Sequence, residues 1–156
     1  MAQRGFTYIE IIFTVAIVAL MATAIMPYVE LSVTRKKEAE LNHSLRQIRT
    51  AIDAYKDAVD DGVIAVDADK SGYPPTLEIL VEGVPNAQDP KKRPIYFLRR
   101  MPRDPMNTDK TIPPAQTWGK RSYDSPADEP KEGEDVYDIY SLSKQEGLNG
   151  IPYNEW

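Results

Sequence analysis

Apolar residues are concentrated near the start of the chain rather than spread along it. Residues 11–29 carry no charged side chain and consist mostly of Ile, Val, Leu, Ala and Met. A helix rises about 1.5 Å per residue, so this run is long enough to span the roughly 30 Å hydrocarbon core of a bilayer. The rest of the chain is polar. The pattern predicts one membrane anchor followed by a small soluble head.

A second apolar pattern follows Pro27, and its spacing of four and three residues is that of a helix. The positions that form this stripe are Leu41, Leu45, Ile48, Ile52, Tyr55 and Val59. We therefore expect one long helix, hydrophobic over residues 6–30 and amphipathic over residues 31–60. Proline removes a backbone donor and should bend or loosen the helix at Pro27. Gly62 is expected to end the helix.

The opposite face of the amphipathic half is polar and is predicted to be solvated. Its residues are Arg46, Gln47, Arg49, Asp53, Lys56 and Asp57. His43 falls outside the apolar stripe and is expected to be exposed. It is the single histidine of a chain that has no cysteine, which argues against a Ser-His-Asp triad and a thiolate metal site. No phosphate-binding loop, dinucleotide fingerprint or nucleophile elbow is present, so the sequence does not indicate an enzyme.

Residues 61–156 are predicted to form a small head of the α+β class. Most of the 13 prolines lie here, which predicts many turns and short elements. Residues 76–80 are typical of a short helix with Thr76 as its cap. Alternating apolar positions predict two antiparallel strands at residues 118–124 and 136–142. The acidic segment between them, residues 125–135, is expected to be a mobile surface loop.

Glu10 is unusual because it stands at the head of the apolar run. A carboxylate close to hydrocarbon costs on the order of a few kcal/mol unless it is paired. A plain membrane anchor does not need this residue, although Glu10 could lie at headgroup level in such an anchor. The position therefore indicates a functional site whose partner is a cation.

The residues around this carboxylate resemble the processing signature of type IV pilin-like proteins. The segment at residues 4–11 reads Arg-Gly-Phe-Thr-Tyr-Ile-Glu-Ile. The resemblance implies that prepilin peptidase removes a leader, residues 1–5, by cutting between Gly5 and Phe6, and that it methylates Phe6. It also implies assembly roles for Phe6, Glu10 and Pro27. The new ammonium on Phe6 would pair with Glu10 of a neighbouring subunit, and a matched cation makes a buried carboxylate tolerable.

Two segments of the head are similar to the major pseudopilins (G-type) of type II secretion systems. These are the Tyr-Pro segment at residues 72–80 and the Pro-x-Asp-Pro loop at residues 98–105. The resemblance implies a long helix packed on a small antiparallel sheet. It implies a filament subunit that polymerises with itself to drive protein export across the outer membrane. The implied partners are prepilin peptidase, minor pseudopilins and an inner-membrane assembly platform.

The resemblance also implies a location: single-pass in the bacterial inner membrane, with a cytoplasmic N-terminus and a periplasmic head, and later in a periplasmic filament. The basic residues Arg35, Lys36 and Lys37 after the apolar run would, counted alone, favour the reverse orientation. Two alternatives stay open. One is the major subunit of a type IV pilus for adhesion, motility or DNA uptake, and the other is an anchored binding protein that does not polymerise.

Two sets of residues could bind calcium. Asp67, Asp69, Ser71 and Glu78 match positions of a calcium-loop template, although Pro74 and Pro75 interrupt it. A turn rich in aspartate and glycine is the alternative explanation for the same residues. In the major pseudopilins a calcium loop follows the last strand, and the resemblance places the alternative donors here at Leu142, Glu146 and Asn149. Gln145 stands where that family usually has aspartate, and Lys144 adds a positive charge beside it.

The chain also carries a basic cluster in its head. Its residues are Lys91, Lys92, Arg93, Arg99, Arg100 and Arg103. The formal net charge of the chain is -5, and aromatic residues within the cluster are few, so nucleic acid is not an expected partner. The acidic loop at residues 125–135 offers a different explanation, which is complementary packing between subunits.

Overall fold

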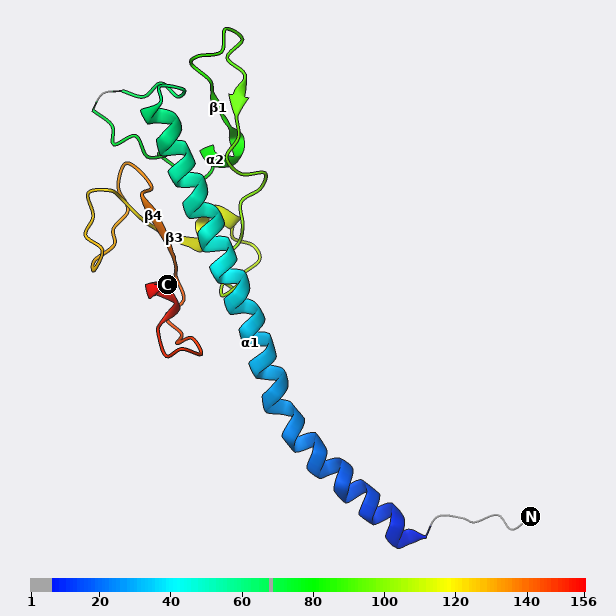
Figure 1. The fold of residues 1–156 in the computed structure, drawn as a ribbon. Helices are drawn as coiled ribbons and strands as arrows, with labels where there is room; N and C mark the ends of the chain where they lie inside the picture. Colours follow the sequence, from blue (N-terminus) through cyan, green and yellow to red (C-terminus); the bar gives the residue numbers. More distant parts are fainter. Residues whose placement is uncertain (1–6, 68) are drawn as a thin grey trace. The chain divides into compact units, whose positions relative to one another are not determined.

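The computed structural model describes residues 7–67 and 69–156, with the side chains of residues 24–27 excepted. The fold is α+β, as predicted: one long helix and short antiparallel strands (Figure 1). The elements in chain order are α1 (Tyr8–Asp60), α2 (Ile79–Glu82), β1 (Val84–Pro85), β2 (Pro94–Ile95), the 3-10 helix η1 (Pro114–Thr117), β3 (Trp118–Arg121), β4 (Asp138–Ser141) and the 3-10 helix η2 (Tyr153–Glu155).

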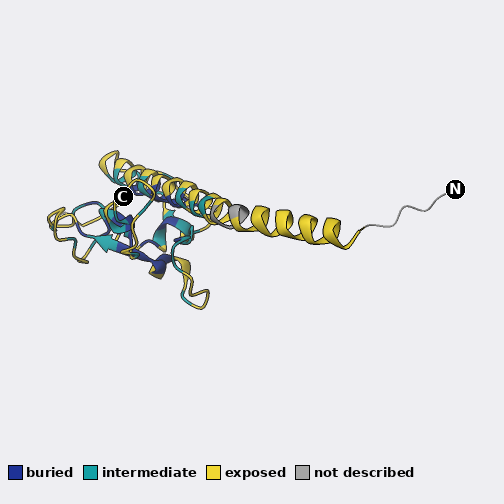
Figure 2. Cartoon of the chain, turned by 90° about the horizontal axis from the view of Figure 1, so that it is seen from below, coloured by how far each residue is buried: buried dark blue, intermediate teal, exposed yellow. Residues whose placement is uncertain are grey.

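The chain divides into two units between Lys36 and Lys37. The first unit contains the apolar part of α1, which is long and apolar enough to cross a membrane. Its described side chains are exposed, with Tyr8 at 81% and Phe13 at 67% (Figure 2). Apolar surface of this extent is unfavourable in water and indicates that lipid or another protein covers it. The backbone of α1 is helical through position 27, and the side chain of Pro27 lies outside the described part.

The second unit is the head, and its core is built on the amphipathic half of α1. The predicted apolar stripe is buried from Leu41 through Tyr55, and Val59 packs against it. The side chains that complete this core include Leu77, Leu80, Trp118 and Ile139. Residues 37–60 therefore fold together with residues 61–156 as one unit.

Gly62 ends α1 as predicted. It has a positive φ of 68°, a conformation that glycine adopts without the steric cost of a Cβ. Its N–H donates to the oxygen of Val59 at 2.9 Å, and the N–H of Val63 donates to the oxygen of Ala58 at 2.8 Å. This pair of bonds is a Schellman motif, which satisfies carbonyl groups left free at the helix end.

Strands β3 and β4 are the two strands that the sequence predicts. They pair antiparallel, with Trp118 opposite Ser141 and Gly119 opposite Tyr140. Figure 1 shows this pair beside the head part of α1. Strands β1 and β2 form a second antiparallel pair, in which Val84 lies opposite Ile95.

The short helix of the head begins later than expected. It covers Ile79–Glu82, and Thr76 makes no capping bond. The reason is the packing of Leu77 and Leu80, both of which are fully buried. The oxygen of Leu80 also accepts the N–H groups of Phe97 and Leu98, at 3.0 and 2.9 Å. These tertiary contacts override the local preference of the sequence.

Candidate assembly and metal sites

The residues predicted to direct processing and assembly lie at the N-terminus. Gly5 and Phe6 lie outside the described residues, so the cleavage site and the ammonium partner of Glu10 stay predictions. Glu10 is exposed at the first turn of α1. Its side chain is accessible to a group from another molecule.

Within its own chain Glu10 has a local role that the sequence analysis missed. The N–H of Glu10 faces Thr7 Oγ1 at 3.4 Å, and Glu10 Oε2 accepts from the N–H of Thr7 at 3.5 Å. This reciprocal arrangement is a capping box, which occupies backbone donors at a helix start. The spacing Thr-x-x-Glu before an apolar run was the available signal. This capping role partly explains why a carboxylate occupies position 10.

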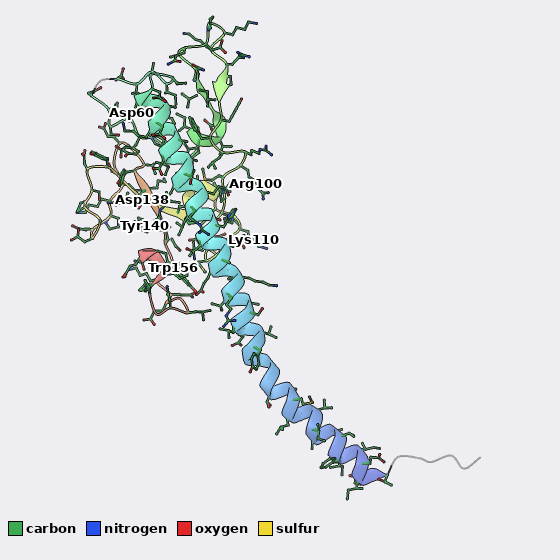
Figure 3. The ribbon with its side chains drawn as sticks, viewed as in Figure 1. Asp60, Arg100, Lys110, Asp138, Tyr140 and Trp156 are labelled. Atoms are coloured by element: carbon green, nitrogen blue, oxygen red, sulfur yellow. The ribbon has the colours of Figure 1, made fainter. Side chains whose placement is uncertain are left out.

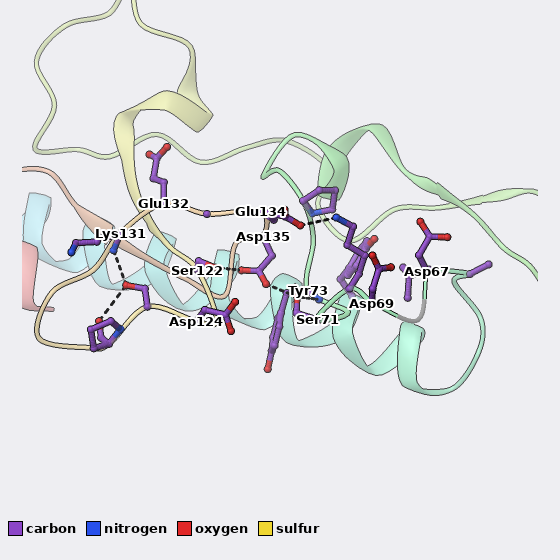
Figure 4. A pocket seen from close by; sticks show the side chains of 18 residues that line it. Asp67, Asp69, Ser71, Tyr73, Ser122, Asp124, Lys131, Glu132, Glu134 and Asp135 are labelled. Carbon is purple, nitrogen blue, oxygen red and sulfur yellow. Dashed lines mark hydrogen bonds and ion pairs between the residues drawn. The ribbon is translucent and has the colours of Figure 1, made fainter.

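The first predicted metal set is only partly brought together. Asp67, Asp69 and Ser71 line one cavity of about 710 Å³ (Figure 4). Glu78 lines a different cavity, beside Glu82 and Gln116. The loop therefore does not wrap around a single point, and Pro74 and Pro75 follow Gly72 where a calcium loop would continue.

Ser71 is already bonded to another residue. Its hydroxyl donates to Asp135, whose other carboxylate oxygen accepts from Ser122 Oγ at 2.8 Å and from the N–H of Tyr123 at 2.9 Å. Asp135 thereby ties the loop after α1 to the loop between β3 and β4. Neutral donors hold this carboxylate in place, which is the arrangement of a structural latch.

Three tyrosines pack beside this latch. The rings of Tyr73 and Tyr123 are stacked with centroids 5.6 Å apart, and Tyr137 meets Tyr73 edge-on at 5.0 Å. Arg121 lies over the ring of Tyr137, 4.8 Å from its centroid. Burial raises the pKa of Tyr73 above its ordinary value. The cluster is aromatic packing that joins the two loops.

The alternative metal set lies in the segment after β4, residues 142–156, which we call the C-terminal segment. Leu142 and Glu146 are exposed. Asn149 Oδ1 accepts the N–H of Ile151 at 3.0 Å, and the oxygen of Gln145 accepts the N–H of Tyr153 at 3.0 Å. Of the predicted donors, the side-chain oxygen of Asn149 is thus engaged in a turn of the segment itself.

The head instead holds this segment through two side chains of α1. Glu38 Oε1 accepts the N–H of Leu148 at 2.7 Å and the hydroxyl of Tyr153 at 3.1 Å. Arg49 Nη2 donates to a main-chain oxygen of Trp156 at 3.0 Å. Tyr153 and Trp156 also pack edge to face, with centroids 5.1 Å apart. An anion and a cation of the helix anchor the middle and the end of the segment.

No group of three or more His, Cys, Asp or Glu side chains in residues 7–67 and 69–156 lies close enough to hold a metal ion. Calcium requires six to eight oxygen ligands. The first donor set is therefore not gathered around one ion in this arrangement, and the donor set of the C-terminal segment stays a prediction.

A long N-terminal helix with an apolar first half, joined to a small head with antiparallel strands, defines a pilin-like α+β protein. The chain is 27% identical over 111 residues to the type II secretion system core protein G of Pectobacterium carotovorum subsp. carotovorum, and 25% identical over 112 residues to the core protein G of Klebsiella michiganensis. These matches confirm the resemblance to the major pseudopilins that the sequence indicates.

Both alignments cover 69% of this chain. They span 64% of the Pectobacterium protein, which is just under two thirds of its length, and 71% of the Klebsiella protein. No family model matches the chain. No solved structure matches it either.

Proposed function

We propose that this protein is a non-enzymatic, structural subunit of a type II secretion pseudopilus. The observation that carries the proposal is the apolar part of α1, whose described side chains are exposed over a length that suits a membrane. A surface of this kind is first covered by lipid and then by the helices of neighbouring subunits. Similarity to two core G proteins supports a pseudopilus as the assembly.

The proposed pathway begins in the inner membrane, with residues 1–5 in the cytoplasm and the head in the periplasm. Prepilin peptidase removes the leader after Gly5 and methylates Phe6. The assembly platform and the minor pseudopilins then admit the subunit to a growing periplasmic filament. Growth of the filament pushes secreted proteins through the outer membrane.

Glu10 sets the register between neighbouring helices in this proposal. Its carboxylate pairs with the ammonium of Phe6 on an adjacent subunit. A cation and an anion that lie together among apolar side chains favour one axial position, since any other leaves both charges unpaired. Pro27 loosens α1 so that the helices pack closely in the filament.

Two substitutions separate this role from helix capping. Glu10→Gln keeps an amide oxygen that serves in a capping box but removes the charge. Thr7→Ala removes the cap but keeps the charge. We expect Glu10→Gln to abolish filaments in cells that overproduce the chain, and Thr7→Ala to retain them. Filaments of normal yield from Glu10→Gln would overturn the register role.

Mass spectrometry of the protein from its native membrane tests processing. A chain that begins at Phe6 with one added methyl group is expected. A chain that begins at Met1 or Ala2, in cells with active prepilin peptidase, would overturn the proposed function and leave a plain membrane anchor.

A further inference from the structure

A cationic groove runs along α1 on the side of the head that faces residues 97–100. It encloses about 780 Å³, and its apolar lining includes Ala51, Ala54, Phe97 and Leu98. Its charged or titratable lining residues are His43, Arg46, Arg99 and Arg100, and no carboxylate lines it. Figure 3 places Arg100 beside α1 on the side away from Asp138. The groove combines apolar surface with positive charge.

The three arginines of the groove have no charged partner within the described structure. Arg49, Arg93 and Arg121 form ion pairs with carboxylates of the chain. Over residues 7–67 and 69–156, by contrast, Arg46, Arg99 and Arg100 form no ion pair and no side-chain hydrogen bond. All three are exposed. Guanidinium groups have a rigid fork of donors suited to carboxylates, so this groove fits an acidic partner.

The other side of the head has the opposite charge. Its cavity is lined by six carboxylates and two lysines: Asp67, Asp69, Asp124, Glu132, Glu134, Asp135, Lys70 and Lys131. The acidic loop of residues 125–135, together with Asp124 directly before it, borders this cavity. In Figure 1 the acidic loop, in orange, lies on the β4 side of α1, whereas the segment that ends at Arg100 lies on the other side.

The acidic loop has carboxylates available for a partner. Asp124 and Asp128 are exposed, and among the described residues neither accepts a hydrogen bond or forms an ion pair. Glu129, Glu132 and Glu134 are also exposed, and each pairs with a single lysine. Surface pairs of this kind contribute little to stability, on the order of 1 kcal/mol or less. They exchange readily for arginines of another molecule.

We propose that the cationic groove of one copy receives the acidic loop of a second copy. The inference rests on the proposed function, because it names the contact between heads in the filament. The two surfaces lie on different sides of one head, so the contact is heterologous. Each copy offers its groove to one neighbour and its acidic loop to another, and the same contact repeats along the filament. Groove against groove is excluded as the contact, since it would set arginines against arginines.

Crosslinking tests the contact, and the chain suits this test because it has no cysteine of its own. Arg99→Cys and Asp128→Cys are introduced together in the full chain, and filaments from cells are treated with a short bismaleimide. A ladder of dimers, trimers and longer products is expected. The matched control pairs Arg99→Cys with Glu155→Cys, which is exposed on the C-terminal segment, and should give no ladder.

Charge exchange provides the second test. Arg99→Glu with Arg100→Glu should abolish filaments, and Asp124→Lys with Asp128→Lys should do the same. All four residues combined should restore them, because the two surfaces are then complementary again. Thermal melts show whether a variant loses filaments because it misfolds. The substituted residues are exposed and form no ion pair in the described structure, so each variant should keep the melting midpoint of the original protein.

The outcomes distinguish this inference from the proposed function. Filaments that form normally but give no Arg99–Asp128 ladder would overturn the groove contact and leave the pseudopilus intact. Filaments that survive both charge reversals would also overturn it, and the groove would then hold a different acidic partner. A chain that forms no filament under any condition and keeps Met1 would overturn the proposed function itself.

Discussion

Arg49 on α1 donates from Nη2 to a main-chain oxygen of Trp156 at 3.0 Å, although the two residues are 107 positions apart. The same guanidinium donates from Nε to Asp138 Oδ1 at 2.7 Å and from Nη2 to the oxygen of Ile139 at 3.0 Å. One side chain therefore joins the helix, β4 and the C-terminal segment. This is the contact pattern expected of a residue that fixes the position of the segment on the head.

Arg49→Lys should destabilise the head by about 1–2 kcal/mol, because an ammonium cannot reproduce the planar fork of donors. Urea unfolding measures the change as a lower midpoint with an unchanged slope. Arg46→Lys is the matched control, since Arg46 lies on the same helix and is exposed. Equal midpoints for the two variants would show that the three bonds of Arg49 contribute nothing.

Glu38→Gln should loosen the C-terminal segment around Leu148 and Tyr153. The carboxylate accepts two hydrogen bonds, from Leu148 and Tyr153, and bonds to a charged acceptor are stronger than those to a neutral amide. We expect a loss of about 1 kcal/mol and faster hydrogen exchange at the amide of Leu148. Glu40→Gln, an exposed neighbour, should change neither. Slow exchange at Leu148 in Glu38→Gln would contradict the anchoring role.

Calcium should have no effect on the thermal stability of the protein. The C-terminal segment is anchored by Glu38 and Arg49, and one oxygen that would coordinate an ion, Asn149 Oδ1, already accepts a hydrogen bond within it. A metal bound only by the folded state at 100 times its Kd would add about 2.7 kcal/mol. Melts with calcium and with a chelator should therefore coincide. A rise with calcium that Asp67→Asn or Glu146→Gln removes would assign the ion to the corresponding loop.

Much of the fold was predictable because its signals are local. The spacing of Leu41, Leu45 and Ile48 determines the buried face of α1, and Gly62 determines its end. Alternation at residues 118–124 and 136–142 was sufficient to predict the pair β3–β4, which the structure confirms. Local periodicity indicates these elements without reference to the rest of the chain.

The interactions missed by the sequence analysis depend on distant partners. Arg49 was predicted to be solvated, and this was wrong, because its three acceptors lie in β4 and at Trp156. Periodicity places a residue on a face but does not show which later segment packs there. The pair β1–β2 was also missed, since each strand has two residues and contains a proline, which is unfavourable within a sheet.

Tyr55 should make the stability of the protein depend on pH in the alkaline range. Burial raises the pKa of its hydroxyl above the ordinary value of 10.0, so the folded protein keeps a proton that the unfolded chain loses. The free energy of unfolding should therefore be fully retained below about pH 10 and fall as the pH rises further. Tyr55→Phe should flatten this decline in urea unfolding measured across the alkaline range. A decline of unchanged steepness in the variant would assign it to other groups.

Gly119 on β3 lies directly across from Tyr140 on β4, and the tyrosine ring occupies the space that a Cβ would need. Gly119→Ala should therefore cost about 1–3 kcal/mol, because the ring must leave its place. Tyr140→Ala clears that space, so Gly119→Ala should cost almost nothing in the Tyr140→Ala background. A double-mutant cycle by urea unfolding isolates this coupling. Equal costs in both backgrounds would show that the Tyr140 ring is not the reason why position 119 requires glycine.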